Sequence, residues 1–228
     1  MVRRILRAQR QVAENQAKYV YCVIKYPAEQ KSFGDLGFDA GDVYTLDYRD
    51  LAPVVSDVVF RDYAVSEGEV EVHRRVVEQV MMEYSVIPVA YGMAFKSRKL
   101  LQIAMGAGYK AMQKAIAVVD GKVELGIKVF LPKELEEWDG AERQDCSADF
   151  LQNLLAVSSD WKSLKLFSDR LILNSAFLVD KSAIQEFSEH VGKLTTKYEK
   201  LKVQYSGPWP AYNFVDIHIL GGHRRGFR

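Results

Sequence analysis

The order of the predicted elements in the second half of the chain constrains its fold more than any other feature. Runs of β-branched and apolar residues predict strands, and apolar residues repeating at three- and four-residue intervals predict helices. The order is strand, helix, strand, strand, helix, strand, at residues 123–131, 147–161, 164–167, 171–179, 183–200 and 201–205. This is the order of two crossover units that share one antiparallel sheet. We therefore expect an α+β fold with a ferredoxin-like domain at residues 120–220, including one added strand at 215–220.

Individual residues set the expected ends of these elements. Ser147 is expected to cap the first helix, because a serine side chain accepts a hydrogen bond from an N–H of the first turn. Ser168-Asp169-Arg170 is expected to form the turn of a hairpin. Pro208 and Pro210 are expected to end the last strand, because proline has no N–H to donate to a strand ladder.

The first half of the chain predicts a separate α+β domain at residues 19–119. Its strand patterns lie at 19–25, 43–48, 53–60 and 85–91, and its helical patterns at 69–84 and 97–119. Asp120-Gly121 is a turn signal and marks the expected domain boundary. We expect residues 1–18 to form a basic arm, either a segment that seeks acidic partners or a solvated helix, and residues 221–228 to form a flexible tail.

Composition limits the class of protein. Hydrophobic residues make up 48% of the 228 residues, which is enough for a sizeable core. With 31 basic and 30 acidic residues the net charge is +1, so no global field attracts nucleic acid or a membrane. Cys22 and Cys146 lack metal spacing, and such sparse cysteine usage is typical of a reducing cytoplasm. No apolar run approaches the roughly 20 residues that span a bilayer, so we expect a cytoplasmic protein.

A stiff aromatic segment occupies residues 205–215 (YSGPWPAYNFV). Its prolines fix φ and keep the preceding residues out of the helical region, so the backbone is expected to be extended. Two interpretations stay open: the rings cap the core beside a strand, or they form a rigid docking surface, since Trp and Tyr bury much area at little entropic cost. The candidate residues for a partner surface, or for the support behind one, are Gly207, Pro208, Trp209, Pro210, Tyr212 and Phe214.

One nucleotide signature offers an alternative function. Residues 106–111 (GAGYKA) match GxGxxA, which would make the chain a Rossmann-type enzyme if a strand preceded the glycines and a helix began at them. However, the apolar helical pattern of 97–119 passes through the glycines, and the next acid, Glu124, opens a strand instead of closing one. Small residues that allow close helix packing explain Gly106 and Gly108 better.

The other residues that could take part in catalysis or metal binding are better explained as structural residues. His73 lies on the apolar stripe of the helix at 69–84, and we expect it to be a partly buried histidine with a satisfied ring. The Gly/Asp-rich loop at 34–42 lacks EF-hand spacing, and the acidic segment at 132–145 lacks histidines, so we expect no metal and no cofactor. No hydrolase, metalloprotease, P-loop or kinase motif is present. These observations point to an interaction or structural protein without catalysis.

Several stretches together resemble the gas vesicle protein family GvpL/GvpF. They are YVYCVI (19–24), DLAPVVSDV (50–58), HRRVVEQVMMEYSVIPVAYGMAF (73–95), ELGIKVF (124–130), LILNSAFLV (171–179) and YSGPWPAYNFV (205–215). The GPWPxYxFV signature is the most specific of them. One departure is Ala90-Tyr91-Gly92, where the family usually has Arg-Phe-Gly, so no role of that arginine is carried over.

The resemblance implies a non-enzymatic accessory or minor structural protein of gas vesicles. Such proteins are similar to assembly factors that contact the shell protein GvpA and other accessory Gvp proteins, with no nucleic acid or membrane involved. It also implies two α+β domains, the second ferredoxin-like, and a cytoplasmic location associated with the vesicle. A ferredoxin-like module that binds a small metabolite is a further possibility, which the sequence neither supports nor excludes.

Overall fold

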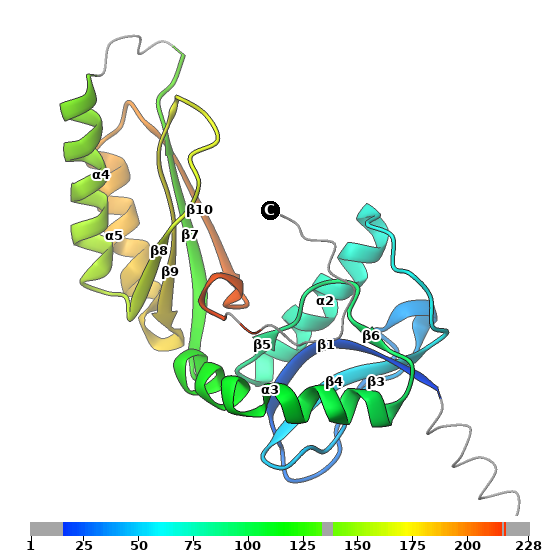
Figure 1. Ribbon diagram of the computed structural model, residues 1–228. Coiled ribbons are helices and arrows are strands. Elements are labelled where there is room, and N and C mark those ends of the chain that lie inside the picture. The colour runs from blue at the N-terminus through cyan, green and yellow to red at the C-terminus, as the bar shows by residue number, and fades with distance from the viewer. Residues whose placement is uncertain (1–15, 134–138, 216, 218–228) are drawn as a thin grey trace, which may run out of the picture. The chain divides into compact units, whose positions relative to one another are not determined.

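The computed structural model describes residues 16–133, 139–215 and 217 (Figure 1). The chain divides into two compact units, which we call the N-terminal unit (described residues 16–120, with 215 and 217) and the C-terminal unit (Gly121–Phe214). Both units combine helices with antiparallel strands, so the predicted α+β class is confirmed. Among the described residues, no helix has both the length and the apolar character needed to cross a membrane.

The N-terminal unit is built on a six-stranded sheet. Its strands are β1 (Ala17–Lys25), β2 (Ser32–Gly34), β3 (Val43–Thr45), β4 (Leu51–Val58), β5 (Ile87–Pro88) and β6 (Ala94–Phe95). They follow the order β2-β3-β4-β1-β5, with β6 also paired to β1. Its helices are the 3-10 turn η1 (Phe38–Ala40), α2 (Glu67–Glu83) and α3 (Arg98–Val119). The long central strand β1 is buried from Ala17 to Ile24 because both of its faces are covered.

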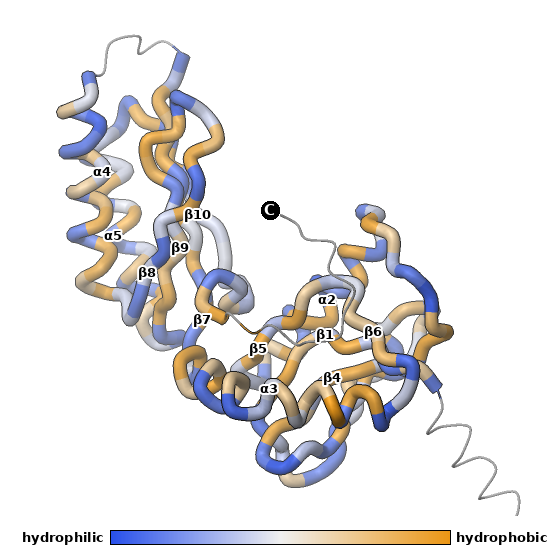
Figure 2. Tube along the Cα trace, in the orientation of Figure 1, coloured by the Kyte–Doolittle hydropathy of each residue, from blue (hydrophilic) through white to orange (hydrophobic). Residues whose placement is uncertain are grey.

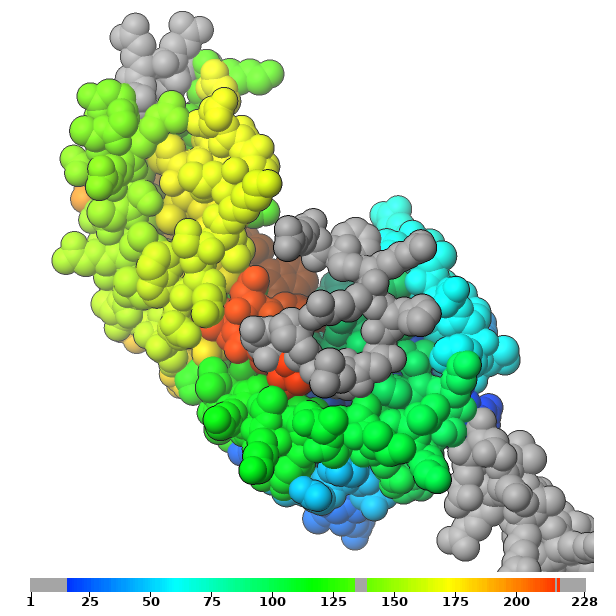
Figure 3. Space-filling model, in the orientation of Figure 1, coloured from blue at the N-terminus to red at the C-terminus, as the bar shows by residue number. Residues whose placement is uncertain are grey.

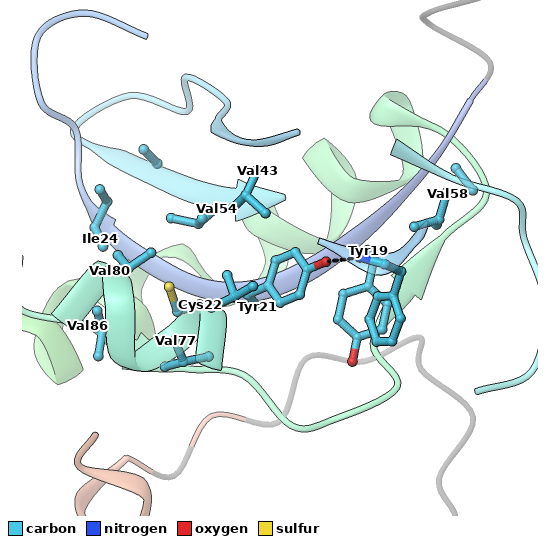
Figure 4. Packing of buried hydrophobic residues seen from close by; sticks show 14 residues of the cluster. Tyr19, Tyr21, Cys22, Ile24, Val43, Val54, Val58, Val77, Val80 and Val86 are labelled. Atoms are coloured by element: carbon cyan, nitrogen blue, oxygen red, sulfur yellow. Dashed lines mark hydrogen bonds between the residues drawn. The ribbon is translucent and has the colours of Figure 1, made fainter. Parts of the chain in front are cut away.

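The two long helices cover opposite faces of this sheet (Figure 1). Val54 and Val58 of β4 share a core cluster with Val77 and Val80 of α2, part of which Figure 4 shows. The alternate residue Val55 points to the opposite face and is fully buried as well. Since α3 contacts β1, β5 and β6, it is the helix that buries this second face.

The C-terminal unit is built on a four-stranded antiparallel sheet. Its strands are β7 (Lys122–Phe130), β8 (Asp160–Ser163), β9 (Leu171–Asp180) and β10 (Lys202–Trp209). They lie in the order β10-β7-β9-β8. Its helices are α4 (Gly140–Leu155) and α5 (Ile184–Lys197), with 3-10 turns η2 (Lys181–Ala183) and η3 (Tyr212–Phe214). From β7 to β10 the elements follow the order that the sequence predicts.

Helices α4 and α5 lie together on one face of the C-terminal sheet (Figure 1). Leu125 of β7 pairs with Phe177 of β9, and the Phe177 ring contacts Phe187 of α5 with 5.4 Å between ring centroids. Hydrophobic residues are frequent in β1 and β4 of the N-terminal sheet (Figure 2), whereas most residues of β8 and β10 are exposed. We call the opposite side of this sheet, which neither helix covers, the helix-free face.

Two element boundaries of the C-terminal unit were predicted wrongly. Helix α4 begins at Gly140, not at Ser147, because Asp139 and Glu142 form a capping box at its start. The strand expected at 164–167 lies at β8 instead, so Trp161 is in a strand and not at a helix end. The connection between β8 and β9 is consequently longer than the predicted three-residue hairpin turn.

The last strand also differs from its prediction. β10 runs through Pro208 to Trp209, with a register shift between Ser206 and Trp209. Since β10 is the edge strand of its sheet, a proline there costs no ladder hydrogen bond on the open side.

The predicted segments at the chain ends lie largely outside the described residues. Of the strand expected at 215–220, residues 215 and 217 have no strand conformation, and the rest is not described. The tail at 221–228 and residues 1–15 of the arm also lie outside the description, while β1 already begins at Ala17.

Candidate partner surface on the last strand

Gly207 lies inside β10, at the register shift between Ser206 and Trp209. Its φ of +113° lies in a region that L side chains rarely adopt. A Cβ at this position would lie 2.8 Å from the main-chain oxygen of Glu124 in β7. The local backbone therefore requires glycine on two independent grounds. The following Gly207–Pro208 peptide is cis.

Trp209 points to the helix-free face of the sheet. It pairs in register with Glu124, and directly opposed residues of an antiparallel pair point to the same face. Glu124 alternates with the buried residues Val123 and Leu125, which point to the helices. Trp209 remains 36% exposed. Its ring is therefore a surface group and not a central part of the core.

A buried carboxylate holds the segment that follows Trp209. Glu124 Oε2 accepts a hydrogen bond from the main-chain N–H of Asn213 at 2.8 Å, and Glu124 Oε1 accepts one from Asn213 Nδ2 at 2.6 Å. Burial raises the pKa of Glu124, and the two bonds from Asn213 act against that rise because they favour the charged form. These bonds fix the turn η3 against β7.

The rings of the segment have different surroundings. Tyr212 is 44% exposed, whereas Phe214 is partly buried. Tyr205, on the helix side of β10, contacts Phe187 with 6.0 Å between ring centroids. In Figure 3 part of this segment, coloured orange to red, lies at the molecular surface. Tyr205 is 38% exposed but its ring contacts the core ring of Phe187, so Trp209 and Tyr212 are the exposed rings that we consider for a partner.

The remaining candidate residues act as support. Pro210 is buried, and its main-chain oxygen accepts a hydrogen bond from the N–H of Tyr212 at 2.7 Å. Gly207 and Pro208 are exposed and set the path of the backbone. Sequence reasoning missed Glu124 and Asn213. In the sequence, Glu124 is an acidic residue that alternates with apolar residues of a strand. Such a pattern ordinarily indicates a solvent-exposed side chain.

The interpretation of residues 106–111 as a Rossmann-type nucleotide site is wrong. Residues 106–111 lie in the interior of α3, so no strand precedes the glycines and no helix begins at them to receive a phosphate. A Cβ on Gly106 would lie 2.9 Å from Tyr48 Oη, and Gly108 is buried. These glycines allow close packing, as the helical pattern predicts.

His73 is a structural residue of the N-terminal core. Its Nε2–H donates to the main-chain oxygen of Val89 at 3.1 Å, and its Nδ1 accepts from Tyr19 Oη at 2.9 Å. Tyr19 Oη also accepts from the N–H of Gly92 at 2.9 Å. Burial lowers the pKa of His73 to about 4. The predicted satisfied histidine is confirmed, and its burial is nearly complete.

The described residues contain no group of three or more His, Cys, Asp or Glu side chains placed to hold a metal ion. In the Gly/Asp-rich loop, Asp42 accepts a hydrogen bond from the Ser32 hydroxyl at 2.5 Å. Part of the acidic segment, residues 134–138, lies outside the description.

Comparison with known proteins identifies the family. The family model of the gas vesicle synthesis protein GvpL/GvpF matches residues 17–140 and 133–216. Gas vesicle protein F1 of Halobacterium salinarum is 35% identical over 192 residues, covering 83% of this chain and 88% of the relative. Gas vesicle protein F of Haloferax mediterranei is 37% identical over 189 residues, covering 81% and 86%. This chain belongs to the GvpL/GvpF family of gas vesicle proteins.

Solved structures show the same fold. The crystal structure of GvpF from Anabaena sp. PCC7120 matches with a TM-score of 0.78 at 17% identity, covering 89% of this chain and 99% of that one. GvpF from Microcystis aeruginosa matches with a TM-score of 0.76 at 18% identity, covering 88% and 99%. At this level of identity the likeness concerns the fold alone.

Proposed function

We propose that this protein binds the shell protein GvpA and other accessory Gvp proteins during gas vesicle assembly. The observation that carries the proposal is the pair of exposed rings, Trp209 and Tyr212, on a segment that buried Glu124 holds in place. Exposed aromatic rings on a pre-ordered backbone are the usual anchors of protein interfaces, because little entropy is lost when they bind. An apolar shell protein needs such a soluble partner before it polymerises.

Family membership supports the biological setting of this proposal. The relatives carry the name gas vesicle protein, which fits a cytoplasmic role beside the vesicle and no catalysis. We further propose that residues 19–119 and 120–220 are two domains and that the second is ferredoxin-like. The division into compact units between residues 120 and 121, and the strand order β10-β7-β9-β8, support this assignment.

Deletion of the gene in a vesicle-forming host tests the function. We expect the deletion strain to form few or malformed vesicles, and the wild-type gene supplied on a plasmid to restore them. Electron microscopy and buoyancy measure the outcome. Vesicles of normal number and shape in the deletion strain would contradict the proposal.

A further inference from the structure

Helix α3 has a second apolar surface besides the one that packs on the sheet. Leu100 is 46% exposed, Ile103 is 60% exposed and Val118 is 47% exposed. Ala107 and Ala111 between them are exposed as well. These five residues, which we call the α3 stripe, follow helical spacing and lie beside the buried face formed by Leu101, Ala104, Met105, Gly108, Met112, Ala115, Ile116 and Val119.

The α3 stripe has the shape of a helix-docking surface. From Leu100 to Val118 it is about 27 Å long at a rise of about 1.5 Å per residue. Its centre is formed by the small residues Ala107 and Ala111, with larger aliphatic residues at both ends. Small central residues allow two helix backbones to approach closely, and the larger side chains then pack into the grooves of the partner. A single narrow aliphatic stripe without Trp or Phe fits a helix better than a membrane surface.

The charge of α3 indicates the chemistry of the partner. Its 22 residues include Arg98, Lys99, Lys110 and Lys114 and not one acid. Lys110 is exposed at one edge of the stripe, and Lys114 is exposed on its line, between Ala111 and Val118. Two acids bond to α3, Asp47 through Arg98 and Asp50 through Tyr109 and Gln113, and both lie toward a different side of the helix. A second copy of the same helix would bring like charges together, which disfavours self-pairing.

We propose that the α3 stripe docks an acidic amphipathic helix of another protein. The apolar side of that helix covers Leu100, Ile103 and Val118, and its carboxylates meet Lys110 at the edge of the stripe and Lys114 on its line. This surface belongs to the N-terminal unit, whereas the rings of β10 belong to the C-terminal unit. The inference therefore stands whether or not the function proposed above is correct.

Two synthetic peptides provide the probe. Both are helices of about 21 residues with the same leucine stripe, one flanked by Glu and the other by Lys. Fluorescence anisotropy measures their binding to the full chain at low and high salt. The Glu peptide is expected to bind at least about tenfold more tightly than the Lys peptide, with an affinity that falls as salt rises. Equal binding of both peptides, or no binding of either, would overturn the proposal.

Variants of exposed residues locate the peptide on the chain. Ile103→Glu is expected to abolish binding of the Glu peptide, and Lys110→Glu with Lys114→Glu to reverse the preference between the peptides. Met82→Glu is the matched control, because Met82 is 77% exposed on α2, and it is expected to bind as wild type. Circular dichroism checks that each variant is folded. Unchanged binding by folded Ile103→Glu would overturn the assignment to α3.

Two further measurements address other occupants of the stripe. If sedimentation velocity shows that the wild-type chain is a dimer and that Ile103→Glu is a monomer, the stripe binds a second copy of the chain and the proposal of an acidic helix is overturned. If the chain floats with vesicles of phosphatidylserine and phosphatidylcholine and Ile103→Glu does not, the stripe binds an anionic membrane and the proposal is likewise overturned. We expect a monomer and no flotation.

Discussion

The two units bury polar groups for different purposes. In the N-terminal unit, His73, Tyr19, Tyr21 and Ser56 hydrogen-bond inside the core, where Tyr21 Oη and Ser56 Oγ are 2.8 Å apart. These groups bond to one another and to the backbone, so they order the interior. In the C-terminal unit the buried acid Glu124 bonds instead to a segment that carries exposed rings. The C-terminal unit also buries Asn174, which donates to the main-chain oxygen of Lys165, but Glu124 differs because it holds a segment with exposed rings.

This comparison is measurable because the natural chromophores separate by unit. All three tryptophans, Trp138, Trp161 and Trp209, lie in residues 121–214, and nine of the twelve tyrosines lie in residues 1–120. Tryptophan fluorescence therefore reports unfolding of the C-terminal unit. Near-UV circular dichroism of tyrosine reports mainly on the N-terminal unit.

The largest expected effect is that of Gly207→Ala. The new side chain would be strained at a φ of +113° and would overlap the main-chain oxygen of Glu124. We expect the free energy of unfolding of the C-terminal unit to fall by about 4 kcal/mol, with the tyrosine signal of the N-terminal unit unchanged. Gly140→Ala is the control, because a Cβ there meets nothing within 4 Å. Equal stability of both variants would contradict the account.

Acid is expected to weaken the N-terminal unit through His73. The pKa of this histidine is 6.5 in the unfolded chain and about 4 in the folded unit. Between these values the unfolded chain binds the proton and the folded unit does not. The stability contributed by neutral His73 is complete above pH 6.5 and falls as the pH decreases toward 4, by about 3 kcal/mol.

Urea unfolding followed by tyrosine circular dichroism measures this dependence. The matched variant is His73→Gln, which keeps a hydrogen-bonding side chain but does not titrate. Its unfolding free energy is expected to change less than that of wild type between pH 6.5 and pH 4. A pH dependence of the same slope in both proteins would mean that other groups cause it.

Glu124 is expected to respond to pH in the opposite direction. Because its pKa is raised in the folded unit above the ordinary 4.5, its contribution to stability is complete below that value and declines as the pH rises. Asn213→Ala removes one of the two donors to this carboxylate. We expect the C-terminal unit to lose about 1 kcal/mol at pH 7, measured by tryptophan fluorescence. A loss that is larger at pH 4 than at pH 7 would contradict this assignment.

The element order was predictable, but several boundaries were not. The capping box of Asp139 and Glu142 lies in an acidic segment that offers many possible caps, so Ser147 was an equally good candidate by pattern. Pro208 was expected to end β10 because proline has no N–H for the strand ladder. This argument applies only where the N–H of that residue would bond to a neighbouring strand. Edge position is a property of the sheet order, which single-strand patterns do not contain.

The sequence also could not predict the orientation of several side chains. The register shift between Ser206 and Trp209 decides which face Trp209 occupies, and such a shift has no simple signature. On α3, Ala104 and Ala115 are buried, whereas Leu100 and Val118 of the same apolar pattern are exposed. The helix is apolar around much of its circumference, so periodicity alone could not identify the face that packs on the sheet.

The central claim is that Trp209 and Tyr212 form a partner surface and do not stabilise the fold. The most direct test is capture of the shell protein GvpA by the Trp209→Ala, Tyr212→Ala double variant, with Leu166→Ala as a control at another exposed hydrophobic residue. We expect the double variant to unfold within about 1 kcal/mol of wild type by circular dichroism and to lose capture at least about tenfold. Capture at wild-type strength by the folded double variant would contradict the claim, as would a double variant that fails to fold.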